Sequence, residues 1–269
     1  MKLAYFNSDG GQIYYEHYSG QRTPVVLIHG WGMSTQVWAA VLDKLVLAGH
    51  EVVAMDHRGC GRSDRDFADL SVEAIAGDLV GIARALALRP CVVNGWSLGG
   101  AVAVEAASQL GDGAAGLVLT CGATPRLTSA EDFPYGGEPG SYEGLGEAIN
   151  ADRGGFFRTL AASVCAVDIG QTNVEWMERM FLDSGPRAYT TLKAGGVMDQ
   201  RATLAALRIP VLAMVGDKDQ IVSPDLGVQA AQCAGNGEVV HFESSGHAPF
   251  LEEPDAYMSA LGNFLERVG

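Results

Sequence analysis

Cys91-Val92-Val93-Asn94-Gly95-Trp96-Ser97-Leu98-Gly99-Gly100 is the stretch that decides the fold of this 269-residue chain. It begins as a short apolar run of strand length and continues into a segment, Leu98 to Leu110, with the composition of a helix. A serine between two glycines at a strand-to-helix junction is the pattern of a nucleophile elbow. A side chain at Gly95 or Gly99 would clash in so sharp a turn. Ser97 is therefore the expected nucleophile, with its hydroxyl exposed at the tip of the turn.

Short apolar runs alternate with amphipathic stretches on both sides of this elbow. The runs expected to form strands are 13–18 (an antiparallel edge strand), 25–28, 51–55, 116–120, 210–215 and 238–242. The stretches expected to form helices are 37–48, 71–88 with Ser71 as N-cap, 224–234 and 254–268. Continuous apolar strands separated by helices predict an α/β fold whose mostly parallel sheet is covered on both faces.

The alternation of strands and helices stops between Gly122 and Ile209. Prolines and glycines mark an irregular entry, and short helices are expected over 156–166, 174–183 and 187–194. No strand–helix–strand unit is visible there. We therefore expect a core domain of residues 1–122 and 209–269, with residues 123–208 inserted as a helical lid over the substrate pocket.

Charge and cysteine usage limit the partners and the compartment. The formal net charge is −14, which would repel nucleic acid and anionic membranes. The five cysteines show no CxxC spacing, and histidines and cysteines are scattered without metal-ligand spacing. The N-terminal residues contain no secretory apolar region, and no apolar stretch approaches membrane-spanning length. These observations predict a cytoplasmic protein with free thiols, no metal and no nucleic-acid or membrane partner.

A serine nucleophile needs a base and a carboxylate that orients the base. On this scaffold the expected chain order is serine, acid, histidine, and only His241 and His247 follow Ser97. His241 lies inside an apolar strand, whereas His247 lies in the loop after the last strand, so His247 is the expected base. Of the two acids after the preceding strand, Asp217 is read as a turn residue and Asp219 as the orienting acid.

The negative charge that develops on an ester carbonyl oxygen needs backbone donors. One is the N–H of Leu98, directly after the nucleophile, and the other is the N–H of Trp31 in the glycine-rich loop 29–32. His29 precedes Ser97 and ends a strand, so we read it as a structural residue of that loop. The loop 56–63 is read as scaffolding, because no acid is placed to orient His57 toward Cys60.

The sequence resembles the α/β-hydrolase superfamily over essentially its whole length. The matching pieces are His29-Gly30-Trp31-Gly32, the loop 56–63, the elbow, Gly216-Asp217-Lys218-Asp219 and Gly246-His247-Ala248-Pro249. The resemblance implies an α/β-hydrolase fold with about eight strands and a serine carboxylesterase that works through an acyl-enzyme intermediate without a cofactor.

Within the superfamily, several pieces look like the pimeloyl-ACP methyl ester carboxylesterase group. They are 29–33, 95–100, 124–126, 132–134 and 247–250. In that group the tryptophans matching Trp31 and Trp96 border the ester pocket, and we add Met33 and Phe250 as expected substrate-binding residues. Residues 153–208 carry seven basic and five acidic side chains, which permits docking of an acidic acyl carrier protein without arguing for it.

The substrate stays open at this point. Apolar side chains of the lid would favour an apolar acyl chain, although such a stripe is more often simple packing; they are Phe156, Phe157, Leu160, Trp176, Met177, Met180 and Phe181. The same elbow also occurs in acyl-homoserine lactonases, and cofactor-free perhydrolases share the triad. A non-catalytic ligand receptor on this fold is the alternative from another class, although an intact triad argues against it. Dehalogenases and epoxide hydrolases need an aspartate where Ser97 stands.

Overall fold

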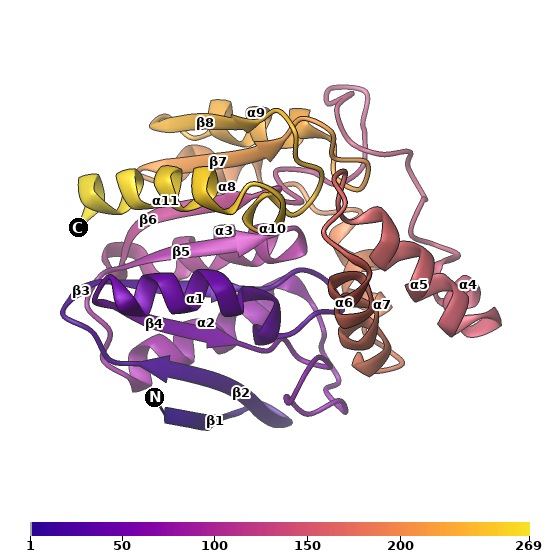
Figure 1. Ribbon diagram of the computed structural model, residues 1–269, viewed down its shortest axis with the longest axis horizontal. Coiled ribbons are helices and arrows are strands. Elements are labelled where there is room, and N and C mark those ends of the chain that lie inside the picture. The colour runs from indigo at the N-terminus through magenta and orange to yellow at the C-terminus, as the bar shows by residue number, and fades with distance from the viewer. Residues whose placement is uncertain (1) are drawn as a thin grey trace.

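An eight-stranded, mostly parallel sheet forms the centre of the protein in the computed structural model, which describes residues 2–269 (Figure 1). The strand order is β1-β2-β4-β3-β5-β6-β7-β8, and only β1 and β2 run antiparallel to their neighbours. The strands are β1 (Lys2–Ser8), β2 (Gly11–Tyr18), β3 (Arg22–Ile28), β4 (His50–Met55), β5 (Cys91–Trp96), β6 (Ala114–Thr120), β7 (Val211–Gly216) and β8 (Gly237–Phe242). The expected α/β-hydrolase fold is confirmed.

Helices cover both faces of the sheet because the central strands are apolar on both sides. Every residue of β5 and β7 is buried. Figure 1 shows α1 (Ala39–Leu47) and α11 (Pro254–Val268) in front of the sheet and α2 (Val72–Ala85), α3 (Leu98–Leu110) and α9 (Pro224–Cys233) behind it. The short elements η1 (Thr35–Trp38), η2 (Gly111–Gly113) and α10 (Pro249–Glu252) join them. As expected, Ser71 caps α2: its hydroxyl accepts a hydrogen bond from the Ala74 N–H at 3.2 Å.

The N-terminal strands correct the sequence prediction. Residues 13–18 were expected to form an edge strand, but β2 pairs with β1 on one side and with β4 on the other. The sequence analysis missed β1 because this strand lies at the rim, where Leu3 and Tyr5 are about half exposed and no clear apolar pattern is needed.

The helices α4 (Leu145–Ala151), α5 (Arg153–Ser163), α6 (Gln171–Asp183), α7 (Tyr189–Gly195) and α8 (Arg201–Ala206) all lie between β6 and β7 in the chain. Three of them, α5 to α7, were predicted with shifted ends, and α4 and α8 were missed because each is only two turns or fewer. Figure 1 shows α4 to α7 gathered at one end of the sheet, whereas α8 packs against α3 and α9 behind it. The inserted helices therefore lie beyond the carboxyl ends of the parallel strands.

The loop 56–63 is tied into the core by a buried ion pair. Arg58 Nε donates to Asp78 Oδ2 on α2 at 2.6 Å, and the two side chains are 8% and 2% exposed. The hydrogen bond to Asp78 raises the pKa of Arg58 further, so the guanidinium stays charged. Asp56 adds two contacts: its carboxylate accepts from the N–H groups of Thr35 and Arg62 at 2.6 and 2.8 Å. These contacts agree with the scaffolding role expected for the loop.

Replacing Asp78 by alanine leaves the Arg58 guanidinium buried without its counter-ion. We expect Asp78→Ala to lower the free energy of unfolding by roughly 3–5 kcal/mol, measured by urea denaturation. Lys44→Ala is the matched control, because its 3.1 Å ion pair with Asp255 is exposed to solvent and should contribute at most about 1 kcal/mol. Equal losses in the two variants would contradict the anchoring role.

Candidate active site

The Ser97 turn forms the centre of the site between β5 and α3. Ser97 has φ 56° and ψ −124°, a strained conformation for a residue with a side chain. A Cβ at Gly95 would lie 2.0 Å from the Gly99 carbonyl oxygen, and one at Gly99 would lie 2.5 Å from the carbonyl oxygens of Ile28 and His29. The steric need for both glycines is thus confirmed. Backbone hydrogen bonds support the strained turn, including Ser97 N–H to Thr120 O at 3.0 Å.

The turn presents the Ser97 side chain to a cavity. Ser97 is half-buried, whereas Trp96 and Leu98 on either side are fully buried. Both Ser97 and His247 line a cavity of about 340 Å³, so the proposed nucleophile and base open into one space. The structure brings these two residues together although they lie 150 positions apart in the chain.

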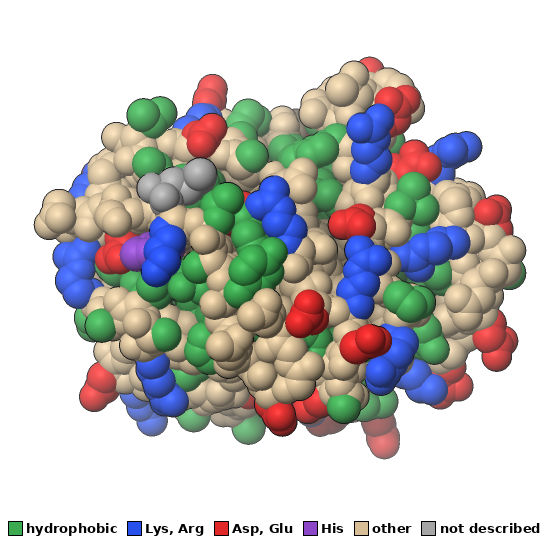
Figure 2. Space-filling model, turned by 90° about the horizontal axis from the view of Figure 1, so that it is seen from below, with side chains coloured by type: hydrophobic (Ala, Val, Ile, Leu, Met, Phe, Trp, Pro, Cys, Tyr) green, Lys and Arg blue, Asp and Glu red, His purple; other side chains and the backbone are tan. Residues whose placement is uncertain are grey.

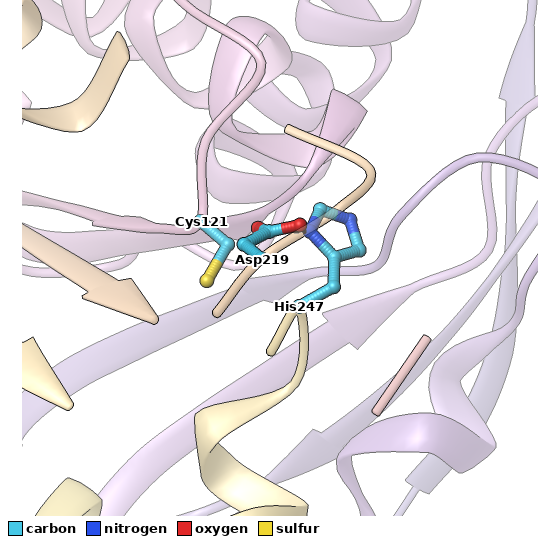
Figure 3. A group of neighbouring side chains, drawn as sticks. All are labelled: Cys121, Asp219 and His247. Carbon is cyan, nitrogen blue, oxygen red and sulfur yellow. Dashed lines mark hydrogen bonds and ion pairs between the residues drawn. The ribbon is translucent and has the colours of Figure 1, made fainter. Parts of the chain in front are cut away.

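Asp219 and His247 form a buried acid–base pair (Figure 3). Asp219 Oδ2 lies 2.7 Å from His247 Nδ1, and the side chains are 1% and 3% exposed. The other oxygen, Oδ1, accepts the N–H groups of Ile221 and Val222 at 2.8 and 2.9 Å. The carboxylate is therefore satisfied on both oxygens and aimed at the imidazole, which orients the ring.

The second acid–histidine pair of this region lies outside the cavity. Asp217 Oδ1 lies 2.7 Å from His241 Nδ1, and both side chains are more than a third exposed. The structure therefore brings Asp219 and not Asp217 to His247. His241 lies on β8, as expected from its apolar strand.

The loop after β3 lies directly against the nucleophile. A Cβ at Gly30 would meet Trp96 Cε3 at 3.0 Å and Ser97 Cβ at 3.1 Å, so a larger residue would push the loop away. Within residues 2–269, the backbone N–H groups of Trp31 and Leu98 donate to no protein acceptor. These two amides are free to serve a substrate oxygen beside Ser97.

His29 fixes this loop as a neutral imidazole. Its Nε2 accepts the His57 N–H at 2.9 Å, so its Nδ1 carries the proton and donates to the Gly30 carbonyl at 2.7 Å. The His29 and His57 rings stack with their centroids 3.8 Å apart. Burial lowers the pKa of His29 to about 4 and that of His57 well below its usual value. His29 thus has the structural role expected of it.

The cavity wall is mostly apolar. Trp31 and Trp96 contribute to it as expected, and among the lid residues considered from the sequence Phe156, Leu160 and Phe181 do so. The sequence analysis missed the wall residues Ala123, Leu127, Tyr142, Leu145, Leu192, Ile221 and Val222. They share no motif, and only their place in the folded chain makes them neighbours.

Met33 and Phe250 do not belong to the cavity lining, so the expectation that they bind substrate is corrected. Both are buried, at 1% and 2% exposure. The Phe250 ring packs between Trp38 and Trp96 at centroid distances of 4.7 and 5.2 Å. These two residues support Trp96 and the Trp31 loop from behind because the core occupies the space their side chains would need to reach the cavity.

Cys121 is a neighbour of the acid–base pair that the sequence analysis did not single out. Its Sγ lies within 4.8 Å of a carboxylate oxygen of Asp219 and a ring nitrogen of His247 (Figure 3). Three such ligand types could in principle hold a metal ion. However, the 2.7 Å hydrogen bond already occupies Asp219 Oδ2 and His247 Nδ1, and burial together with the Asp219 charge raises the pKa of the Cys121 thiol well above its usual value. This cluster fits an acid–base pair beside a neutral thiol.

Comparison with known proteins identifies the family. A family model described as the alpha/beta hydrolase family matches residues 25–260. The chain is 31% identical over 252 residues to the pimeloyl-[acyl-carrier protein] methyl ester esterase of Stenotrophomonas maltophilia (strain K279a), which covers 92% of this chain and 94% of that protein. It is also 31% identical over 268 residues to a non-heme haloperoxidase of Rhodococcus erythropolis, covering 96% and 97%. Among solved structures, the esterase EaEST from Exiguobacterium antarcticum superposes with a TM-score of 0.93 at 24% identity, covering 97% and 98%, and shows the shared fold.

The chain belongs to the alpha/beta hydrolase family. The resemblance to the pimeloyl-ACP methyl ester esterase group is confirmed, and these relatives agree with the carboxylic ester hydrolase expected from the sequence. Over residues 2–269, the helices are all too short or too polar to cross a membrane.

Protonation of His29 would break its bond to the His57 N–H. Since the folded-state pKa is about 4 and the ordinary value is 6.5, the unfolded chain takes up a proton first as the pH falls. The stability that depends on neutral His29 is therefore complete above pH 6.5 and is lost as the pH falls toward 4, by about 3 kcal/mol. We expect the difference in unfolding free energy between the wild type and His29→Gln to shrink by that amount between pH 7 and pH 4. The comparison isolates His29 from Asp56, whose raised pKa of about 6 acts in the opposite direction. A difference that stays constant over this range would contradict the assignment.

Proposed function

We propose that this protein is a serine carboxylesterase that uses Ser97, His247 and Asp219 as a catalytic triad. The observation that carries the proposal is the buried 2.7 Å contact between Asp219 and His247 at a cavity that Ser97 also lines. The strained elbow and the unengaged N–H groups of Trp31 and Leu98 support the same chemistry.

In the proposed reaction, His247 accepts the Ser97 proton as Oγ attacks the ester carbonyl carbon. The Trp31 and Leu98 N–H groups donate to the carbonyl oxygen as it becomes negative. The carbon–oxygen bond to the alcohol then breaks, and the alcohol leaves with the proton from His247. Water attacks the acyl group on Ser97 and gives a proton to His247, which returns it to Ser97 as the carboxylic acid departs. None of these steps needs a metal or a cofactor.

The cavity supports an ester with an uncharged, apolar acyl part. Its wall contains no Asp, Glu, Lys or Arg among the residues the structure describes, and Phe156, Leu160 and Phe181 contribute apolar surface. Phe157, Met177 and Met180 are fully buried, so for these lid residues packing is the better reading. We propose a small-molecule ester as the substrate.

A carrier-linked substrate has weaker support. The named relative acts on an acyl-carrier-protein ester, but several lid arginines already have partners. Arg158 pairs with Glu178 and Arg201 with Asp199, at 3.3 and 2.6 Å. On the face shown in Figure 2, acidic and basic side chains are interspersed and neither sign dominates. We therefore prefer a free ester to a carrier-bound one.

We also propose that residues 123–208 act as a lid on a core of residues 1–122 and 209–269; Met1 lies outside the described residues. The support is that α4, α5 and α7 contribute cavity wall residues from beyond the strand ends. All five cysteines are free thiols, which supports the reducing cytoplasm as the compartment.

The triad is tested by a pair of matched variants. We expect Ser97→Ala to lower kcat/KM for p-nitrophenyl butyrate by at least about 10³-fold and Asp219→Asn by about 10³–10⁴-fold, because the imidazole loses its orienting acceptor. Asp217→Asn is the control and should stay within about twofold, since Asp217 faces His241 away from the cavity. A larger loss in Asp217→Asn than in Asp219→Asn would overturn the assignment of the acid. Full activity in Ser97→Ala would overturn the mechanism.

Perhydrolysis is a second candidate because the chain is 31% identical to a protein named as a non-heme haloperoxidase. In this reaction hydrogen peroxide replaces water in the attack on the acyl-enzyme, and a peracid leaves instead of the carboxylic acid. We expect hydrolysis to dominate, so that peracid formed from ethyl acetate and peroxide is less than about a tenth of the acetate released. Peracid formation as fast as hydrolysis would favour the second candidate over the lactonase and the non-catalytic receptor as well.

A further inference from the structure

Helix α5 has a hollow on each side of it. One is the active-site cavity of about 340 Å³, and the other is a hollow of about 430 Å³ between α4 and α5 on the outer side of the lid. Phe156, Leu160 and Ser163 line both spaces. Since they are spaced by four and three positions, they lie on one face of α5. The two spaces are therefore separated by a single row of side chains and not by backbone.

This row is free to move, whereas its neighbour is fixed. Phe157 is fully buried, and its ring stacks on Phe181 at a centroid distance of 5.5 Å with 2° between the planes. It also contacts Trp31, at 5.9 Å, and the Arg153 guanidinium lies 4.7 Å from its ring centroid. Phe156 and Leu160 are only half-buried. A change of rotamer at these two side chains can join the spaces without moving α5 itself.

The outer hollow suits an uncharged alkyl chain. Apart from Phe156 and Leu160, it is lined by small or uncharged residues and by one acid, Asp152. That carboxylate caps α5 by accepting the Gly155 N–H at 2.9 Å. Among the residues described, no Lys or Arg lines the hollow, so a chain that ends in a carboxylate would meet a negative group without a cation to pair with.

We propose that the acyl chain of a long substrate passes between Phe156 and Leu160 into the hollow between α4 and α5. These two side chains then set the acyl length that the enzyme accepts, and the preferred substrates are esters of medium- to long-chain fatty acids with an uncharged methyl end. This inference rests on the proposed esterase function. At about 30 Å³ for each group the size of a water molecule, the inner cavity alone holds about eleven such groups. A longer chain together with its ester and alcohol part needs the second space.

A third hollow next to the cavity is the competing path. It has a volume of about 620 Å³, shares only Tyr142 with the cavity wall, and is lined by Arg126, Glu143 and Lys193. An alkyl chain directed there would have to displace water from charged groups. The outer hollow at α5 shares three residues with the cavity and is less charged, so we favour it.

The experiment measures kcat/KM for p-nitrophenyl acetate, butyrate, octanoate and laurate in the wild type, Phe156→Ala, Phe156→Trp and Leu160→Ala. For the wild type we expect kcat/KM to rise up to about fourfold per added methylene until the inner cavity is full. Phe156→Ala and Leu160→Ala should raise the laurate-to-acetate ratio by about tenfold, the equivalent of about two further buried methylenes. Phe156→Trp should lower that ratio by about tenfold and leave acetate within about twofold.

Leu182→Ala is the matched control, because Leu182 is an exposed apolar side chain of the lid that lines neither space. A laurate-to-acetate ratio that moves equally in the control, or that responds to Tyr142→Ala and not to Phe156→Ala, would overturn the proposal. Calorimetric titration with dodecanol tests the path without ester cleavage, and Phe156→Trp should weaken binding by about tenfold. If the wild type cleaves none of the esters, the proposed function fails. Dodecanol binding that is unchanged in Phe156→Trp contradicts the chain path alone.

Discussion

The approach of α3 to the strand ends constrains the rest of the site. The turn at Ser97 brings backbone within contact of backbone, since no Cβ fits at Gly95 or Gly99. The turn also keeps Ser97 in a conformation that costs free energy, of the order of 1–3 kcal/mol. Such strain persists only where the surroundings hold the residue in place, and here β5, β6 and the loop after β3 all do so. The hydroxyl therefore has little freedom of position before a substrate arrives.

Two buried polar systems maintain this arrangement from opposite sides. His29 links the Trp31 loop to the loop 56–63 through hydrogen bonds that need a neutral ring. Asp219 holds His247 on the other side of Ser97, with both carboxylate oxygens occupied. Trp96 connects the two systems: its ring lines the cavity, and its indole N–H donates to the His247 carbonyl at 2.7 Å. Each reacting group is thus fixed by hydrogen bonds to a different part of the sheet edge.

Local sequence predicted the features that depend on local chemistry. The elbow, the order of acid and base, and the choice of Asp219 over Asp217 follow from turn residues and strand ends, and the structure places these residues accordingly. The cavity wall could not be predicted in the same way. Tyr142 and Leu192 reach it from irregular segments and short helices, while Met33 lies next to the right motif but points into the core. The strand β1 escaped for a related reason, because a half-exposed rim strand needs no apolar periodicity.

The His247 backbone N–H donates to the Val164 carbonyl at 2.8 Å, directly after α5 ends. Close packing reinforces this contact, since a Cβ at Gly246 would lie 2.8 Å from the Ala166 nitrogen. The inserted helices are therefore joined to the loop of the catalytic histidine by more than their chain connections at β6 and β7. In evolutionary terms, the insertion is not an interchangeable module. A homologous recombination that imports a foreign lid would have to carry the 164–166 segment and the 246–247 loop as one inherited block.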